Sequence, residues 1–404
     1  MPKLNITHVV PYFVPAWAYG GIPRLAYELA REQARMGHHV AVITTDAMDA
    51  RSRHPESGRT VSMEDGRMCV RYLRNLSNRH AYDHQLFLPF GLGKALDELA
   101  ADSNVIHIHG HRHILEVAAA RFAAARGIPY VITANGSAPR IERKAAIKGA
   151  LDAIALDKVL RSANAVIAVC REEIKQYTDR GVTRDKIHII PNGLDVEAFD
   201  NLPRAGAFRA EWSLDDSPIV LYLGKITPRK GLVHLARALN IIRQNRKIRL
   251  VIAGNDMGYL PQVRREIMDL DMSGITLFTG LLRGMSKRAA YVDANVTVYP
   301  SEYEIFGLVP FESILCGTPV VVSDDCGCGE IIGEANIGET VPYGQPDKLA
   351  QAIEGVIDRP EESTGRVERG KAFIRENLAW PKIAADTVEL YGKPARVSGE
   401  ETSE

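Results

Sequence analysis

The sequence predicts an α/β protein of two doubly wound domains, each with a parallel sheet. Short apolar runs of strand length alternate with segments whose apolar residues recur at helical spacing, and this alternation occurs twice along the chain. The runs are almost continuously apolar, as expected for parallel strands covered on both faces. With 404 residues, the chain also exceeds what one hydrophobic core usually serves.

The first series begins with a strand-like run at residues 4–10, followed by a helical pattern at 22–36. Further strands are expected at residues 40–44, 105–108, 130–133, 165–169 and 186–191. The segment 201–207, which contains proline and glycine, then has the composition of a linker. We therefore expect a first domain at residues 1–200.

The second series predicts strands at residues 219–223, 249–253, 275–278, 296–299 and 319–323. This series defines a second domain at 201–377, and the polar tail 393–404 is expected to be disordered. Ligands of doubly wound sheets bind beyond the carboxyl ends of the strands, so two such domains would face a shared interdomain cleft.

The composition excludes several classes of protein. Lys plus Arg and Asp plus Glu are both 50, so no bulk electrostatic binding to nucleic acid is expected. Five cysteines do not make a disulfide framework in so long a chain, which favours reduced thiols and the cytoplasm. We identify neither a signal peptide nor an apolar run of the roughly 20 residues that span a bilayer. At most, the protein is expected to lie on a membrane surface.

The most informative motif runs from Glu304 to Glu312, between a strand and a Gly-Thr-Pro turn. We expect a helix to begin at Gly307, with Glu304 at its N-terminus and Glu312 two turns into it, so that the two carboxylates lie on the order of 10 Å apart. The expected anion site consists of the free backbone N–H groups of Phe306, Gly307, Leu308 and Val309. A nucleotide-sugar has a diphosphate with a sugar on each side. Its diphosphate suits the anion site, and its sugar hydroxyls suit the two carboxylates as hydrogen-bond acceptors.

Two further turns suit phosphate. Gly20 and Gly21 lie between the first strand and the first helix, where backbone can approach a phosphate closely, although such a turn can also serve chain reversal alone. After the first strand of the second series come Gly224, Lys225, Arg229 and Lys230. Their cations suit a diphosphate, and the alternative is a solvated basic loop.

Four histidines alternate at the end of a strand, at positions 107, 109, 111 and 113. A metal site normally draws ligands from several segments, so we expect no metal here. His109 is the first candidate for contacting a substrate hydroxyl and His111 the alternative. Cys326-Gly-Cys328 is also too small to define a metal site and is typical of a tight turn.

Together these motifs resemble the family 4 retaining glycosyltransferases, which have the GT-B fold of two Rossmann-like domains. The resemblance covers nearly the whole chain. It depends on Gly20-Gly21, His109, Pro191-Asn192-Gly193, Lys230-Gly231, and the Glu304 to Glu312 motif with Cys316-Gly-Thr-Pro-Val-Val after it.

The resemblance implies transfer of a sugar from a nucleotide donor with retention of configuration and without a bound metal or other cofactor. It implies that Glu304 binds the donor sugar hydroxyls, Glu312 the ribose hydroxyls, and Lys230 the departing diphosphate. His109 would contact the donor sugar. Where the family usually has Gly-Arg, this chain has Gly224-Lys225, so Arg229 is expected to assist. A final helix, near residues 378–392, is implied to return to the first domain.

The acceptor is expected to be a saccharide or a lipid-linked sugar, in cell-surface polysaccharide or glycolipid assembly. Candidate acceptor contacts are His111, Asn135 and Arg140. The basic amphipathic stretch 139–148 suits either an anionic membrane at the inner face of the plasma membrane or an ordinary solvated helix. A sugar-nucleotide epimerase, a phosphorylase and a non-catalytic nucleotide-sugar-binding protein remain open as alternatives on the same fold.

Overall fold

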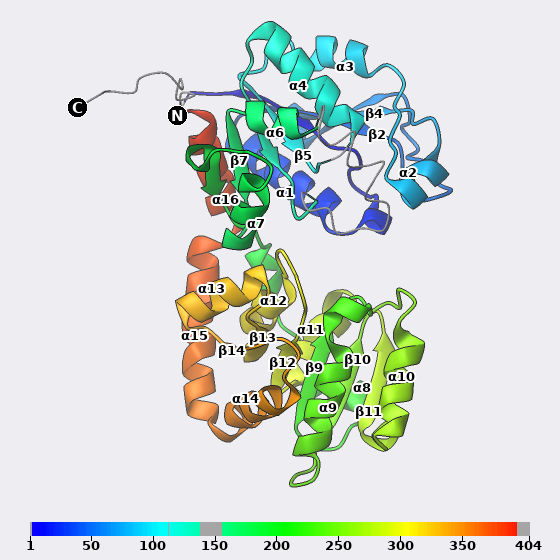
Figure 1. Cartoon of the computed structure of the whole chain (residues 1–404), viewed down its shortest axis with the longest axis vertical. Helices are drawn as coiled ribbons and strands as arrows, with labels where there is room; N and C mark the ends of the chain where they lie inside the picture. The colour runs from blue at the N-terminus through cyan, green and yellow to red at the C-terminus, as the bar shows by residue number, and fades with distance from the viewer. Residues whose placement is uncertain (1, 112, 138–155, 394–404) are drawn as a thin grey trace, which may run out of the picture. The chain divides into compact units, whose positions relative to one another are not determined.

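The computed structural model describes residues 2–111, 113–137 and 156–393 (Figure 1). The chain divides into two compact units, one formed by Met1–Gly193 with Trp380–Glu404 and the other by Leu194–Ala379. The division therefore falls between residues 193 and 194, not at the expected 200/201. The Leu194 N–H donates to the Leu378 carbonyl oxygen (2.7 Å), and the Leu194 side chain lies in the core of the second unit. Residues 394–404 of the expected tail lie outside the described residues.

The first unit contains an eight-stranded sheet with the order β3-β4-β2-β1-β5-β6-β7-β8. Its strands are β1 (Asn5–Val9), β2 (His39–Thr45), β3 (Thr60–Met63), β4 (Met68–Leu73), β5 (Val105–His109), β6 (Tyr130–Thr133), β7 (Ala165–Ala168) and β8 (Ile187–Ile189). All six predicted strands are present. The strands that follow β1 in the chain, β2 to β4, lie on one side of it, whereas β5 to β8 lie on the other side. The carboxyl ends of the neighbours β1 and β5 therefore form the topological switch point of this sheet.

The first sheet is parallel, as predicted, except at one edge. Strand β3 pairs with β4 antiparallel, from Thr60 opposite Arg71 to Met63 opposite Met68. The two strands are joined by the short turn Glu64–Gly66, which can only reverse the chain. Both strands escaped prediction, and β3 is a half-exposed edge strand without a continuous apolar run.

The helices of this unit are α1 (Ile22–Arg35), α2 (Asn78–His84), α3 (Leu92–Leu99), α4 (Ile114–Arg126), α6 (Asp157–Ser162), α7 (Arg171–Thr178) and α16 (Trp380–Tyr391). Helix α1 begins after Gly21 with Pro23 in its first turn, where the missing N–H costs nothing. Its buried face, including Ala26 and Leu29, packs against the sheet.

The last helix, α16, is the red helix of Figure 1 and packs beside α1. Its side chains Trp380, Ile383 and Val388 join the core that covers β1, β5, β6 and β7. Gly193 lies directly against the Trp380 ring, where a Cβ would come within 2.4 Å of ring carbon. The end of the chain thus completes the first unit.

The second unit contains a six-stranded parallel sheet with the order β11-β10-β9-β12-β13-β14. Its strands are β9 (Ile219–Leu223), β10 (Arg249–Ala253), β11 (Thr276–Gly280), β12 (Val296–Tyr299), β13 (Val320–Ser323) and β14 (Glu339–Val341), the last of which was not predicted. Its switch point lies between β9 and β12.

Helices cover both faces of this second sheet. They are α8 (Ala207–Glu211), α9 (Leu232–Ile242), α10 (Leu260–Asp269), α11 (Gly284–Asp293), α12 (Val309–Leu315), α13 (Gly327–Ala335), α14 (Pro346–Asp358) and α15 (Pro360–Asn377). Helices α9 and α14, green and orange in Figure 1, pack side by side over one core, and α12, α13 and α15 pack over another. Within the described part of the chain, no helix combines the length and apolar character needed to cross a bilayer.

Candidate active site

The predicted site residues within the described part of the chain fall into two groups, one in each unit, and most of them lie near the switch point of their sheet. In the second unit, Lys230 follows β9 at the end of the short helix η6 (Pro228–Lys230), and Glu304 follows β12. Because β9 and β12 are neighbours and parallel, the segments after them emerge at the same edge of the sheet. Residues 74 positions apart are therefore brought into contact.

Lys230, Glu304 and Tyr299 form a closed cluster. The Lys230 ammonium is ion-paired with Glu304 and donates a hydrogen bond to the Tyr299 hydroxyl oxygen (2.7 Å). The Tyr299 hydroxyl in turn donates to Glu304 Oε2 (3.1 Å). Burial, together with the Glu304 charge, raises the pKa of Tyr299 well above its usual value. Tyr299 therefore remains a protonated donor, and it is a site residue that the sequence patterns did not reveal.

Close backbone packing holds Lys230 in place. Gly231 has φ +63°, in the left-handed region, and a Cβ there would lie 1.9 Å from the Pro300 carbonyl oxygen. The chain after β9 thus touches the chain after β12, and only glycine permits this approach. The same device recurs at Gly254, where a Cβ would lie 1.7 Å from the Gly224 carbonyl oxygen.

The other two predicted cations do not join this cluster. Lys225 and Arg229 are exposed. The Arg229 guanidinium lies 5.9 Å from the centre of the Tyr303 ring, and the Lys225 carbonyl oxygen accepts a hydrogen bond from Tyr222 (2.8 Å). Lys230 is therefore the cation that the tertiary structure places beside Glu304.

The expected starting residue of helix α12 is wrong. The helix begins at Val309 and has Pro310 in its first turn, so Glu312 lies in that first turn and not two turns inside. Gly307 precedes the helix and packs on the Tyr299 ring, where a Cβ would lie 2.7 Å from a ring carbon. Gly307 also lies against Cys328, whose sulfur is 3.2 Å from the position that a Cβ on Gly307 would take. Phe306 and Leu308 also precede the first helical residue.

Glu312 has its own partners. Its Oε2 atom lies 2.5 Å from the Lys287 ammonium and accepts a hydrogen bond from Tyr291 (2.9 Å). Lys287 and Tyr291 both come from α11, one turn apart, and neither was predicted as a site residue. A single lysine at helical spacing before a tyrosine is too common a pattern to signal this contact.

In the first unit, the strand pairing assembles a buried cluster of three histidines. His8 of β1 lies opposite His107 of β5, and His109 follows two residues later on the same face. The rings of His107 and His109 stack at 4.2 Å between centres, and those of His8 and His109 at 5.1 Å. Sequence analysis missed His8, although a histidine within an apolar strand was a visible signal.

The predicted alternation of histidines ends at His109. Gly110 turns the chain with φ +86°, so His111 does not continue the row. Instead, buried His111 has its Nδ1 3.5 Å from a Glu116 carboxylate oxygen. His109 and Asn135 both line one small cavity of about 30 Å³ within the first unit. Arg140 and the basic stretch 139–148 lie outside the described residues.

Hydrogen bonds determine which nitrogen of His109 carries its proton. His8 Nε2 donates to the Gln33 amide oxygen (2.7 Å), so a neutral His8 must accept at Nδ1. Its partner there, 2.8 Å away, is His109 Nε2, which therefore donates. This leaves His109 Nδ1 with a free lone pair that can accept a hydrogen bond from a hydroxyl.

The same chain of donors reaches the last helix. The Gln33 amide nitrogen donates to the Tyr391 hydroxyl oxygen (3.2 Å), and the Tyr391 hydroxyl can donate to His107 Nδ1 (2.6 Å). His107 Nε2 then faces the Thr133 hydroxyl (2.8 Å). The three histidines lie close enough together for a metal site, but both nitrogens of His8 and of His107 are hydrogen-bonded. A metal would have to displace these partners.

Burial keeps the histidines neutral. It lowers the pKa of His8 from 6.5 to about 4 and the pKa values of His107 and His109 well below the usual value. Between pH 6.5 and 4, an unfolded chain binds a proton at His8 that the folded chain does not. The contribution of neutral His8 to the free energy of unfolding is thus complete above pH 6.5 and is lost as the pH falls toward 4. The loss is on the order of 3 kcal/mol.

Replacing His8 by asparagine should therefore reduce the slope of the free energy of unfolding against pH across this window, because one of the three buried histidines that bind a proton on unfolding is gone. Urea unfolding of both proteins at a series of pH values measures the slope. The exposed His84→Asn variant, at the end of α2, should keep the wild-type slope. Equal slopes for wild type and His8→Asn would contradict the assignment.

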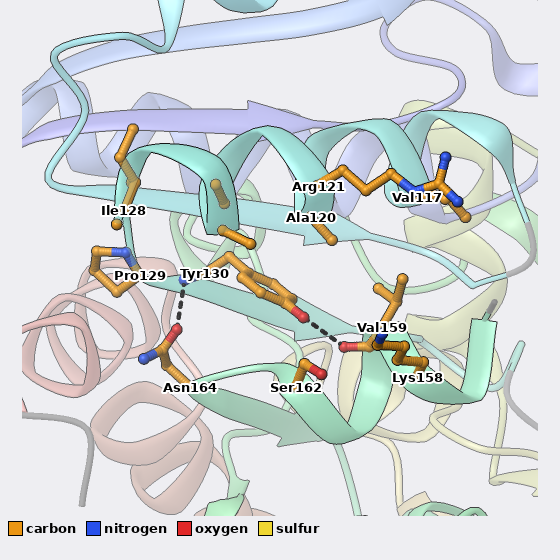
Figure 2. A pocket seen from close by; sticks show the side chains of 13 residues that line it. Val117, Ala120, Arg121, Ile128, Pro129, Tyr130, Lys158, Val159, Ser162 and Asn164 are labelled. Carbon is orange, nitrogen blue, oxygen red and sulfur yellow. Dashed lines mark hydrogen bonds between the residues drawn. The ribbon is translucent and has the colours of Figure 1, made fainter. Parts of the chain in front are cut away.

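A separate hollow of about 590 Å³ lies in the first unit between α4 and α6 (Figure 2). Tyr130 crosses it and donates its hydroxyl to the Val159 carbonyl oxygen (2.7 Å), while the Asn164 side chain accepts from the Tyr130 N–H (2.9 Å). No predicted site residue lines it. Because residues 138–155, outside the described part, lead into α6, we assign this hollow no ligand.

Comparisons with known proteins agree with this architecture. The sequence model of Glycosyltransferase Family 4 matches residues 19–198, and that of Glycosyl transferases group 1 matches residues 206–373. The chain is 28% identical over 402 residues to an uncharacterised glycosyltransferase of Methanocaldococcus jannaschii, covering 95% of this chain and 97% of that one. It is 27% identical over 332 residues to the alpha-maltose-1-phosphate synthase of Mycolicibacterium smegmatis, covering 75% and 84%.

Among solved structures, HepE of Anabaena in complex with UDP superposes with a TM-score of 0.75 at 16% identity, covering 96% of this chain and 99% of that one. At this identity the likeness shows the fold. The two family matches together span both units, and the two sheets have the expected Rossmann-like topology. The chain therefore belongs to the family 4 glycosyltransferases, which have the GT-B fold, and acts as a glycosyltransferase on a nucleotide-sugar donor.

Proposed function

We propose that this protein is a retaining hexosyltransferase that moves a sugar from a UDP- or GDP-linked donor to a saccharide or lipid-linked acceptor. The observation that carries the proposal is the Lys230–Glu304–Tyr299 cluster at the switch point of the second sheet. It sets a cation for a diphosphate beside a carboxylate for sugar hydroxyls. HepE of Anabaena was solved with UDP and also with UDP-glucose, which supports a donor of this class.

In the proposed reaction, the bond between the anomeric carbon and the diphosphate oxygen breaks, and the acceptor oxygen bonds to the same face of that carbon. The acceptor proton passes to the departing phosphate, so no protein base is required. Lys230 stabilises the negative charge that develops on the leaving diphosphate. We assign Glu304 to the donor sugar hydroxyls, Glu312 to the ribose, and the free lone pair of His109 Nδ1 to a sugar hydroxyl.

The proposal includes independence from metal ions, since the Lys230 ammonium supplies the positive charge that a metal would otherwise provide. Full activity after dialysis against EDTA supports this part, and activity that returns only with a divalent cation would overturn it. We also propose a role in cell-surface polysaccharide or glycolipid assembly, at the cytoplasmic side of the membrane. Failure to bind anionic vesicles at low salt would remove the membrane contact.

A panel of UDP- and GDP-hexoses tests the donor. A ligand that binds only the folded state stabilises it, by about 2.7 kcal/mol at a concentration 100-fold above its dissociation constant. We expect one donor to raise the melting temperature clearly more than the others. Glu304→Gln and Lys230→Ala should reduce this rise, whereas the exposed-lysine variant Lys247→Ala should not. No shift with any donor would contradict the proposed donor class.

Incubation with the identified donor, labelled in its sugar, then separates the reactions. Transferred product supports a transferase, whereas an epimerised nucleotide-sugar or a sugar phosphate would indicate the alternative enzymes. Binding without any product would indicate a non-catalytic binding protein. Nuclear magnetic resonance of the product gives its anomeric configuration, and an inverted linkage would overturn the retaining mechanism.

A further inference from the structure

Two buried thiols lie beside the proposed donor site. Cys326 and Cys328 flank Gly327 at the start of α13, and their sulfur atoms are 3.3 Å apart. Their Cα atoms are two residues apart in the chain and so cannot be separated by more than about 7 Å, close to the range that a disulfide spans. An S–S bond is about 2.05 Å long, so the sulfurs need to approach by only a little more than 1 Å.

The environments of the two thiols differ in a way that suits oxidation. Cys326 is the N-cap of α13, and its sulfur accepts a hydrogen bond from the Gly329 N–H (3.3 Å). A hydrogen bond from Cys328 lowers the pKa of Cys326, whereas burial raises the pKa of Cys328 well above its usual value. Cys326 is thus the more readily ionised and nucleophilic sulfur, and Cys328 is the thiol that can resolve an oxidised Cys326.

The same turn holds the loop that carries Glu304. The Gly327 N–H donates to the Glu304 carbonyl oxygen (2.7 Å), in a single parallel bridge between Glu304 and Cys326. Gly307 packs against the Cys328 sulfur, which lies 3.2 Å from the position that a Cβ on Gly307 would take. Any movement of Cys328 therefore reaches both Gly307 and the Tyr299 ring on which it packs.

We propose that Cys326 and Cys328 form a reversible oxidation site, in which a hydroperoxide converts the two thiols into a disulfide and weakens nucleotide-sugar binding. With hydrogen peroxide as the oxidant, the Cys326 thiolate attacks one peroxide oxygen, the O–O bond breaks, and the released hydroxide takes a proton to become water. Cys328 then attacks the resulting sulfenic acid, forms the S–S bond and releases a second water. With hydrogen peroxide, the two thiols are oxidised and the peroxide is reduced to two waters.

The effect on binding rests on the proposed function, whereas the oxidation chemistry does not. Drawing the Cys328 sulfur toward Cys326 removes it from its packing contact with Gly307 and strains the Gly327–Glu304 hydrogen bond. The carboxylate of Glu304 would then leave its position beside Lys230. We expect about tenfold weaker donor binding, as for the loss of one hydrogen-bonding contact.

Mass spectrometry tests the oxidation site on the full chain. Reduced protein is treated with hydrogen peroxide, its free thiols are alkylated, and the tryptic peptide 289–348 is fragmented so that Cys316 in the same peptide is distinguished. We expect a disulfide between Cys326 and Cys328 that dithiothreitol reverses. Alkylation of both thiols after peroxide treatment, or pairing through Cys316, would overturn the site.

Donor binding is then measured for the reduced and oxidised proteins with UDP-glucose and GDP-mannose as probes. Cys326→Ser keeps an N-cap side chain, so this variant should fold, bind donor and resist peroxide. Cys328→Ala provides a second variant that cannot form the bond. Equal affinities of reduced and oxidised wild type would overturn the coupling to the donor site. Binding by neither form would overturn the coupling and the proposed function together, while the mass result still decides the oxidation site.

Discussion

Replacing Lys230 by alanine is expected to lower the turnover number roughly 100- to 1,000-fold while the protein stays folded. The ammonium is the one cation within the Glu304–Tyr299 cluster among the described residues, and in the proposed reaction its charge is needed most when the diphosphate departs. Because this interaction is strongest in the transition state, turnover should fall more than the apparent donor affinity. Steady-state kinetics with the donor identified by thermal shift measures both quantities.

Glu304→Gln should show a loss of similar order, because the amide keeps the shape of the carboxylate but not its charge. The ion pair is partly exposed, so neither variant should lose much stability. Circular dichroism and thermal melting check the fold, and Lys247→Ala is the matched control for removal of a lysine from the same unit. Near-normal turnover of Lys230→Ala or Glu304→Gln would refute the role assigned to that residue.

Replacing Gly231 by alanine should destabilise the second unit by roughly 2–5 kcal/mol. Gly231 has φ +63°, which an L-residue adopts only at a cost, and the new methyl group would overlap the Pro300 carbonyl oxygen at 1.9 Å. Separating the two segments would also move the adjacent Lys230 away from Glu304. Urea unfolding should therefore show the lost stability, and kinetics should show lost turnover.

Gly280→Ala provides the matched control. Gly280 has φ +73°, but no atom lies within 4 Å of the position that its new methyl group would take, so only the backbone term, about 1–2 kcal/mol, should be lost. The difference between the two variants measures the close approach of the chains after β9 and β12. If both variants lose the same stability, that approach does not constrain the site.

The sequence by itself determined the elements that depend on local periodicity. Continuous apolar runs located the six predicted strands of the first sheet and the five predicted strands of the second, because a buried parallel strand must be apolar on both faces. The turns after β9 and β12 also supplied Lys230 and Glu304 as candidates, one for the diphosphate and one for the donor sugar hydroxyls, whereas their ion pair is a finding of the structure. Edge strands β3 and β14 were missed since their exposed faces weaken that signal.

Local patterns also misplaced the start of α12. The flexibility of Gly307 suggested a helix opening, whereas packing of Gly307 on Tyr299 and the presence of Pro310 in the first turn put the start at Val309. Lys225 and Arg229 were expected at the diphosphate from the charge of their loop and from the resemblance. Both are exposed and lie outside the Lys230–Glu304–Tyr299 cluster, and their contact with a diphosphate stays a prediction.

Only the tertiary structure decided which polar groups meet. His8 and His107 lie 99 positions apart and become neighbours through the pairing of β1 with β5, and Tyr391 reaches His107 from the last helix. Such contacts depend on strand register and on the packing of distant helices, which no local spacing encodes. The surroundings of Cys326 and Gly307 also depend on the tertiary structure, because both residues lie where separate turns are buried against one another.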